Sequence, residues 1–205
     1  MGSHYCANCK NNCCVHENGG TFVTIKEAER IAEAMGMPID DVCTFAEDNG
    51  LKDDSDHLNY FNLQVSYNGK ILPLAYKKHV LILKKKQGRW ECPFLGENGC
   101  RIPELRPTYC HIFPFWFKVV KGSISIFPMN APTKSMETCM IRKAHFNDRT
   151  HERILGEIGE TKPGLLKMLH AYLEEIRQYQ NYAPLLYKGI LPSEAAMLLR
   201  REKPL

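Results

Sequence analysis

The sequence has no long apolar run. Its longest, from Ile112 to Phe117, contains a proline and is far shorter than the roughly 20 residues that a helix needs to span a bilayer. The N-terminal residues also lack the apolar core of a secretory signal. We therefore expect a cytoplasmic protein with no membrane partner. In that compartment, clustered cysteines more often bind metal or act in catalysis than form disulfides.

The sequence also has no large net charge and no nucleotide-binding motif. The net charge is only +4, and the longest basic run, Lys84-Lys85-Lys86, ends a predicted strand, where lysines are common on a solvated edge. No phosphate-cradling loop and no Gly-x-Ser-x-Gly elbow is present. We do not expect nucleic acid as a partner, and the sequence names no substrate, protein partner or catalytic residue.

The N-terminal half predicts two helices. With 205 residues and 44% hydrophobic content, the chain is large enough to bury a core without disulfides. Thr24 and Glu27 have the spacing of a capping box, and the apolar face that follows predicts a helix ending at Gly36. A second short helix is expected from Pro38 through about Ala46.

Period-2 patterns predict strands in the middle of the chain. Asn68-Gly69 favours a tight hairpin turn between the first two strands, and Lys121-Gly122 favours another between the last two. The expected strands are Asn62 to Tyr67, Ile71 to Tyr76, His79 to Lys85, Phe115 to Lys121, and Ser123 to Phe127.

The remainder is expected to be helical from about Ser135. An apolar stripe between Leu165 and Tyr179 predicts a helix that packs on its own domain, and a last helix is expected from Ser193. The predicted class is α+β: a small antiparallel sheet with packed helices, cysteine-rich metal-binding loops and a helical C-terminal region. We expect a cysteine-cluster domain over residues 1–148 and a helical extension over 149–205 that packs on it.

Nine cysteines are the distinctive feature of the sequence, and most of them fall into two groups. Cys6-x2-Cys9 has a spacing that suits structural zinc and iron–sulfur sites, whereas the adjacent pair Cys13-Cys14 favours a polynuclear centre or two nearby sites. Cys43 is expected to be a buried apolar residue. The predicted metal ligands are Cys6, Cys9, Cys13, Cys14, Cys92, Cys100, Cys110 and, as an eighth member, Cys139.

These motifs resemble the YkgJ-type cysteine-cluster family, also described as zinc- or iron-chelating CxxCxxCC proteins. The resemblance rests on Cys-x2-Cys-x3-Cys-Cys, Cys92-Pro93-Phe94-Leu95, Gly99-Cys100-Arg101-Ile102 and Arg106-Pro107-x2-Cys110, and covers roughly residues 6 to 140. An arginine usually follows the last of these cysteines in the family, and here His111 takes its place. The same cysteine pattern is similar to that of flagellin lysine methylases, which implies a role near protein modification.

Both an iron–sulfur cluster and zinc remain open as the cofactor. The gaps of seven and nine residues within the second cysteine group resemble no standard zinc ribbon, which favours iron–sulfur. Lys10, Arg101 and Arg106 are available to offset thiolate charge, and His16 or His111 could add an imidazole ligand. The expected function is metal binding with redox or electron transfer; the alternatives are a non-catalytic zinc module and an accessory to protein modification.

Overall fold

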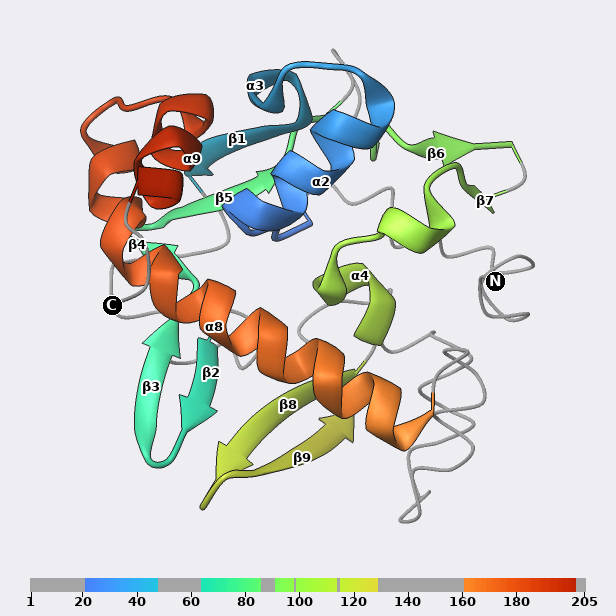
Figure 1. Ribbon diagram of the computed structural model, residues 1–205, viewed down its shortest axis with the longest axis vertical. Helices are drawn as coiled ribbons and strands as arrows, with labels where there is room; N and C mark the ends of the chain where they lie inside the picture. Colours follow the sequence, from blue (N-terminus) through green and yellow to red (C-terminus); the bar gives the residue numbers. More distant parts are fainter. Residues whose placement is uncertain are drawn as a thin grey trace.

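A computed structural model describes residues 21–47, 64–85, 91–97, 99–113, 115–128 and 161–201. Two helices are followed by a series of short strands, which a short helix interrupts, and two C-terminal helices pack against them (Figure 1). The predicted α+β class is confirmed. The helical onset near Ser135 and the domain boundary after residue 148 lie outside the described residues.

Helix α2 (Ile25–Met35) begins at the predicted capping box. The Thr24 hydroxyl accepts a hydrogen bond from the Glu27 backbone N–H (3.1 Å), and the Glu27 carboxylate accepts one from the Thr24 N–H (2.9 Å). The helix ends at Gly36, whose φ of 62° lies in the left-handed region that glycine adopts without steric cost. These local interactions determine both ends of α2, as predicted.

The predicted second helix is too long. Helix α3 (Ile39–Val42) is followed at once by strand β1 (Cys43–Glu47). Strand β1 pairs antiparallel with β5 (His79–Leu83), with Phe45 opposite Leu81. The ladder hydrogen bonds and the burial of Val42 and Cys43 outweigh the local preference of this segment for helix.

One three-stranded antiparallel sheet has the order β1–β5–β4, with β4 at Ala75–Tyr76. Residues 21–23 lie along β5: the Val23 N–H donates to the Leu81 carbonyl (3.0 Å), and the Leu83 N–H donates to the Thr21 carbonyl (2.9 Å). The first described residues are therefore held to the sheet by backbone hydrogen bonds.

A second sheet has the order β3–β2–β8–β9, formed by β2 (Gln64–Tyr67), β3 (Lys70–Pro73), β8 (Phe115–Val120) and β9 (Ser123–Pro128). Both predicted hairpins are confirmed, but the pairing of β2 with β8 is parallel, so this sheet is mixed. The strand expected over residues 71–76 is divided between two sheets. Leu74, fully buried between β3 and β4, separates them, and Pro73 has no N–H with which to continue a ladder.

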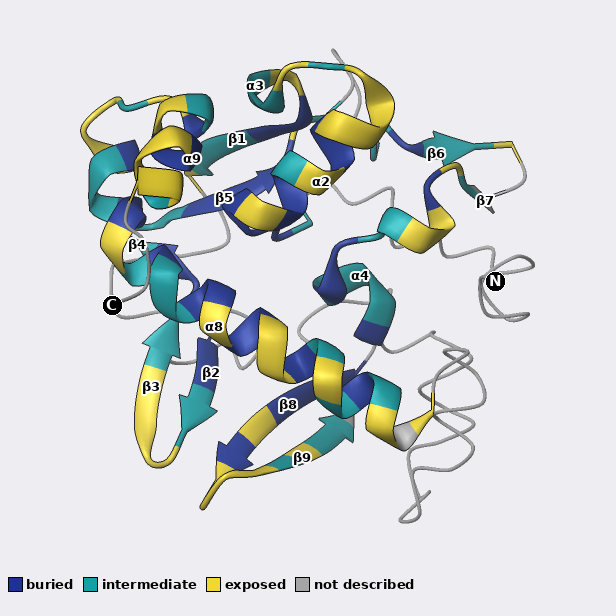
Figure 2. Ribbon diagram, viewed as in Figure 1, coloured by how far each residue is buried: buried dark blue, intermediate teal, exposed yellow. Residues whose placement is uncertain are grey.

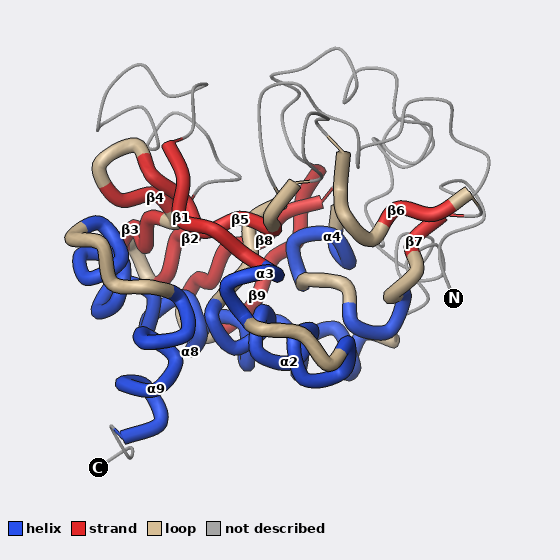
Figure 3. The backbone as a smooth tube through the Cα atoms, turned by 90° about the horizontal axis from the view of Figure 1, so that it is seen from above, coloured by secondary structure: helices blue, strands red, loops and turns tan. Residues whose placement is uncertain are grey.

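The C-terminal helices cover these sheets. Helix α8 (Lys162–Tyr187) and helix α9 (Pro192–Arg201) confirm the predicted helices, and α2, α8 and α9 gather on one side of β1 and β5 (Figure 3). One face of α8 is buried and the other exposed (Figure 2). The buried face of α8 contains Leu165, Leu169, Tyr172, Leu173, Ile176 and Tyr179.

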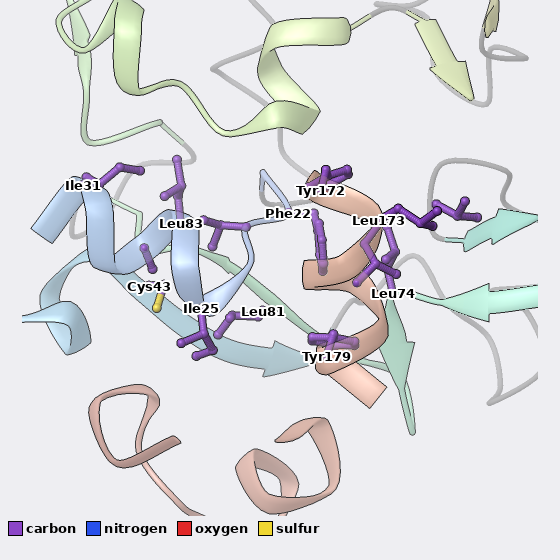
Figure 4. Close-up of a cluster of buried hydrophobic side chains, with 14 of the residues drawn as sticks. Phe22, Ile25, Ile31, Cys43, Leu74, Leu81, Leu83, Tyr172, Leu173 and Tyr179 are labelled. Carbon is purple, nitrogen blue, oxygen red and sulfur yellow. The ribbon is translucent and has the colours of Figure 1, made fainter. Parts of the chain in front are cut away.

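The larger of two hydrophobic clusters joins the two ends of the described chain. The Phe22 ring meets Tyr179 and Tyr172 on α8 edge to face, with ring centroids 5.6 Å and 6.4 Å apart (Figure 4). The same cluster of buried side chains extends to Ala196 on α9. Among the helices of the described residues, none combines the length and apolarity that crossing a membrane requires.

Candidate metal centre

Two of the predicted ligands, Cys92 and Cys100, lie before and at the end of a small hairpin formed by β6 (Leu95–Gly96) and β7 (Gly99–Cys100). Leu95 is directly opposite Cys100, and the Leu95 N–H donates to the Cys92 carbonyl (3.1 Å). The turn before β6 therefore brings Cys92 back towards the end of β7. Both thiols are half-buried and neither forms a disulfide.

The third thiol comes from helix α4 (Thr108–Ile112), which follows the 3₁₀ turn η3 (Pro103–Leu105). Burial raises the pKa of the Cys110 thiol to about 12. A hydrogen bond from the Thr21 side chain opposes this rise, whereas the charges of Cys92, Cys100 and Glu27 add to it. The three thiols of the central group are therefore close enough to interact electrostatically.

Positive charge and an N–H donor surround Cys100. Burial is the main cause that raises the pKa of this thiol, and the Ile102 backbone hydrogen bond and the nearby charges of Arg106 and Arg101 oppose it. Each arginine is anchored to its own loop: Arg101 donates to the Pro93 carbonyl (2.6 Å), and Arg106 donates to the Pro103 carbonyl (3.1 Å). Donors and cations placed in this way stabilise a thiolate that binds metal.

The central thiols do not form a closed site by themselves. Within the described ranges, no three His, Cys, Asp or Glu side chains come together closely enough to hold a metal ion. His111 is half-buried on α4 and has an interaction of its own. The other predicted ligands, Cys6, Cys9, Cys13, Cys14 and Cys139, lie outside the described residues, as do Lys10 and His16.

Two supporting residues were not recognised from the sequence. Thr21 reaches the Cys110 thiol, and Glu27 accepts a hydrogen bond from the backbone N–H of Thr108 on α4 (2.7 Å). The capping-box pattern identified only the bond of Glu27 to Thr24. No local signal marks a partner that is 81 residues away in the chain.

Cys43 belongs to the core and not to this group. It is 1% exposed at the start of β1, its thiol donates to the Ile39 carbonyl (3.6 Å), and burial raises its pKa to about 12. Asp40 adds to the rise, and Lys84 opposes it. A buried thiol of this kind behaves as a small apolar side chain, as predicted.

A Cys43→Ser chain is expected to keep its full metal content and to lose about 1–2 kcal/mol of unfolding free energy, because a more polar group is buried. Metal analysis together with urea denaturation tests both parts. A loss of metal at this position would place Cys43 among the ligands.

The donor set fits a soft or borderline metal. Thiolates are ligands for zinc and for iron–sulfur clusters, and the described part of the site contributes three of them with cations and an N–H donor nearby. Cys92, Cys100 and Cys110 are the described residues that would hold such a group. When bound, the metal would supply positive charge to neutralise the thiolates.

The comparison with protein families agrees with this chemistry. Residues 5–140 match the family model CxxCxxCC, described as "Putative zinc- or iron-chelating domain", which supports metal binding. No solved structure gives a significant match to the chain. Because the match spans well over half of the sequence, the chain belongs to the CxxCxxCC family.

Proposed function

We propose that this protein binds metal through a centre in which the N-terminal and the central cysteine groups converge. The ligands are Cys6, Cys9, Cys13, Cys14, Cys92, Cys100 and Cys110, with Cys139 as an eighth. The observation that carries the proposal is the position of Cys110, whose thiol interacts with Cys92, Cys100 and the Thr21 side chain.

Thr21 supports the convergence of the two groups. Its side chain forms a hydrogen bond with the Cys110 thiol, and its carbonyl accepts one from the Leu83 N–H. Cys14 precedes Thr21 by only seven residues. Even a fully extended chain of that length spans no more than about 25 Å. Covalent connectivity therefore limits how far Cys14 can lie from Thr21, which is compatible with its convergence on the central thiols.

The finer assignment is an iron–sulfur cluster that serves redox or electron transfer. The gaps of seven and nine residues between Cys92, Cys100 and Cys110 differ from the close pairs of structural zinc sites. Iron–sulfur clusters require only that thiolates converge from different loops. Arg101 and Arg106 near Cys100 would offset the net negative charge of a thiolate-bound cluster.

The test is anaerobic, iron-replete production followed by metal and acid-labile sulfide analysis and a visible spectrum. Iron, sulfide and a brown colour bleached reversibly by a reductant are expected. Stoichiometric zinc in colourless protein would contradict the iron–sulfur assignment and support a zinc-binding module. Folded protein with neither metal, and with all thiols free, would overturn metal binding itself.

A further inference from the structure

The buried carboxylate of Glu27 connects helix α2 to the helix that carries Cys110. One carboxylate oxygen accepts the Thr24 N–H (2.9 Å), and the other accepts the Thr108 N–H (2.7 Å). The Thr108 side chain adds a second hydrogen bond to the same carboxylate. Glu27 is 2% exposed and Thr108 6% exposed, so these bonds are shielded from water.

Helix α4 depends on this connection. It has only five residues, fewer than an isolated helix needs in water, and its N-cap residue, Pro107, makes no side-chain capping bond. Without Glu27, the buried N–H of Thr108 at the start of α4 would lose its acceptor, which is costly. Glu27 thus supplies, from α2, the cap that α4 lacks.

The charge of Glu27 does not explain its presence near the thiols. Burial is the main cause that raises its pKa, and the nearby carboxylate of Glu175 adds to the rise. Glu175 is itself held by the Thr24 hydroxyl and by Arg30 (3.0 Å). A second negative charge disfavours a thiolate at Cys110, so any contribution of Glu27 to metal binding has to come from the position that it gives to α4.

We propose that Glu27 is a positioning residue of the metal centre, which holds helix α4 and so determines where the Cys110 thiol lies relative to Cys92 and Cys100. This rests on the proposed function, because Cys110 has to be a ligand. Thr108, which donates the hydrogen bond to Glu27, lies two residues before Cys110 in the same short helix. A change in the direction of the helix would therefore move the Cys110 sulfur. The capping box of α2 then supports both the fold and the ligand geometry.

Two variants test the link from its two ends. Glu27→Gln replaces one of the two acceptor oxygens with an N–H₂ group, which accepts no hydrogen bond. The backbone N–H groups of Thr24 and Thr108 then have to compete for the one oxygen that remains. Thr108→Pro removes both hydrogen bonds to Glu27, and proline is well tolerated at the first position of a helix. Pro107, with φ −50° and ψ 145°, has the extended backbone that a residue before proline adopts.

The measurement is the affinity of the metal-stripped, reduced full chain for zinc ions, in competition with a chromophoric chelator. Both variants are expected to bind about tenfold or more weakly, the range known for changes in groups that orient metal ligands. Glu175→Gln is the matched control: it makes the same carboxylate-to-amide change in the same buried network, but the Glu175 carboxylate accepts its hydrogen bonds from Thr24 and Arg30, at helix α2. It is expected to lower the unfolding midpoint of the metal-free chain while its zinc affinity stays within about twofold of the wild type.

The outcomes separate the two hypotheses. Wild-type affinity in Glu27→Gln and Thr108→Pro, with affinity lost in Cys110→Ser, would overturn the positioning role and leave the metal centre intact. Equal weakening in Glu27→Gln, Thr108→Pro and Glu175→Gln, in step with their loss of stability, would reduce Glu27 to a purely structural residue. A wild-type chain that binds no zinc, and that also contains no iron when isolated, would overturn the proposed function and this inference with it.

Discussion

A Cys110→Ser chain is expected to retain less than about a tenth of the wild-type metal, because a serine hydroxyl does not supply the thiolate that zinc and iron–sulfur centres require. Burial of the Cys110 thiol raises its pKa to about 12, so at neutral pH only a bound cation keeps this sulfur deprotonated. Metal and sulfide analysis of the anaerobically purified chain measures the effect.

Cys43→Ser is the matched control for this substitution. Both thiols have a pKa raised to about 12 by burial, and both substitutions replace a thiol with a hydroxyl, at a core position for Cys43 and at a half-buried one for Cys110. Only Cys110 interacts with other cysteines of the central group. Equal metal contents in the two variants, with equal losses of stability, would contradict the assignment of Cys110 as a ligand.

Removal of the metal by a chelator is expected to open the central loop and leave the core folded. Ligation that stabilises the loop by about 3 kcal/mol suppresses its local opening about a hundredfold, so amide exchange over residues 91–113 is expected to speed up by that factor. Cys92 and Cys100 pack only at the margin of the core that contains Phe22, Tyr172 and Tyr179, and these three aromatic residues are expected to keep their protection. Hydrogen exchange with mass spectrometry on the metal-bound and stripped full chain gives both values.

The amides of β8 and β9 are the internal reference for that experiment. These strands pair along six residues each, and their Trp116 is buried, with its indole N–H bonded to the Gln64 carbonyl (2.7 Å). Faster exchange there as well would mean that the metal is needed for the whole fold, as in small zinc modules. Unchanged exchange over residues 91–113 would contradict a metal centre in this loop.

Elements with local signals were predicted correctly. The capping box requires only that Thr24 and Glu27 lie three residues apart, and Asn68-Gly69 forms its turn because both residues tolerate a positive φ, here 47° and 82°. The apolar period of α8 also follows from neighbours three or four residues apart. Such interactions are available to the chain before it folds, so they can be recognised in the sequence.

Elements whose conformation depends on distant partners were predicted less well. Residues 43–47 form a strand because β5 offers them a ladder, although the segment was expected to be helical. The segment 71–76 is divided between two sheets because Leu74 is buried at the junction. In both places tertiary pairing and burial outweigh local preference.

For the candidate site, the residue types can be read from the sequence: two groups of thiols with a spacing that places the chain in the CxxCxxCC family, and two arginines beside them. The electrostatic interaction of Cys110 with Cys92 and Cys100, the hydrogen bond from Thr21 to its thiol, and the capping of its helix by Glu27 become visible only in the folded chain. They are absent from the local pattern because the partners are far apart along the chain. A contact between residues 81 positions apart forms only after sheets and helices have packed and the entropy of closing the loop has been offset, and no local pattern encodes that outcome.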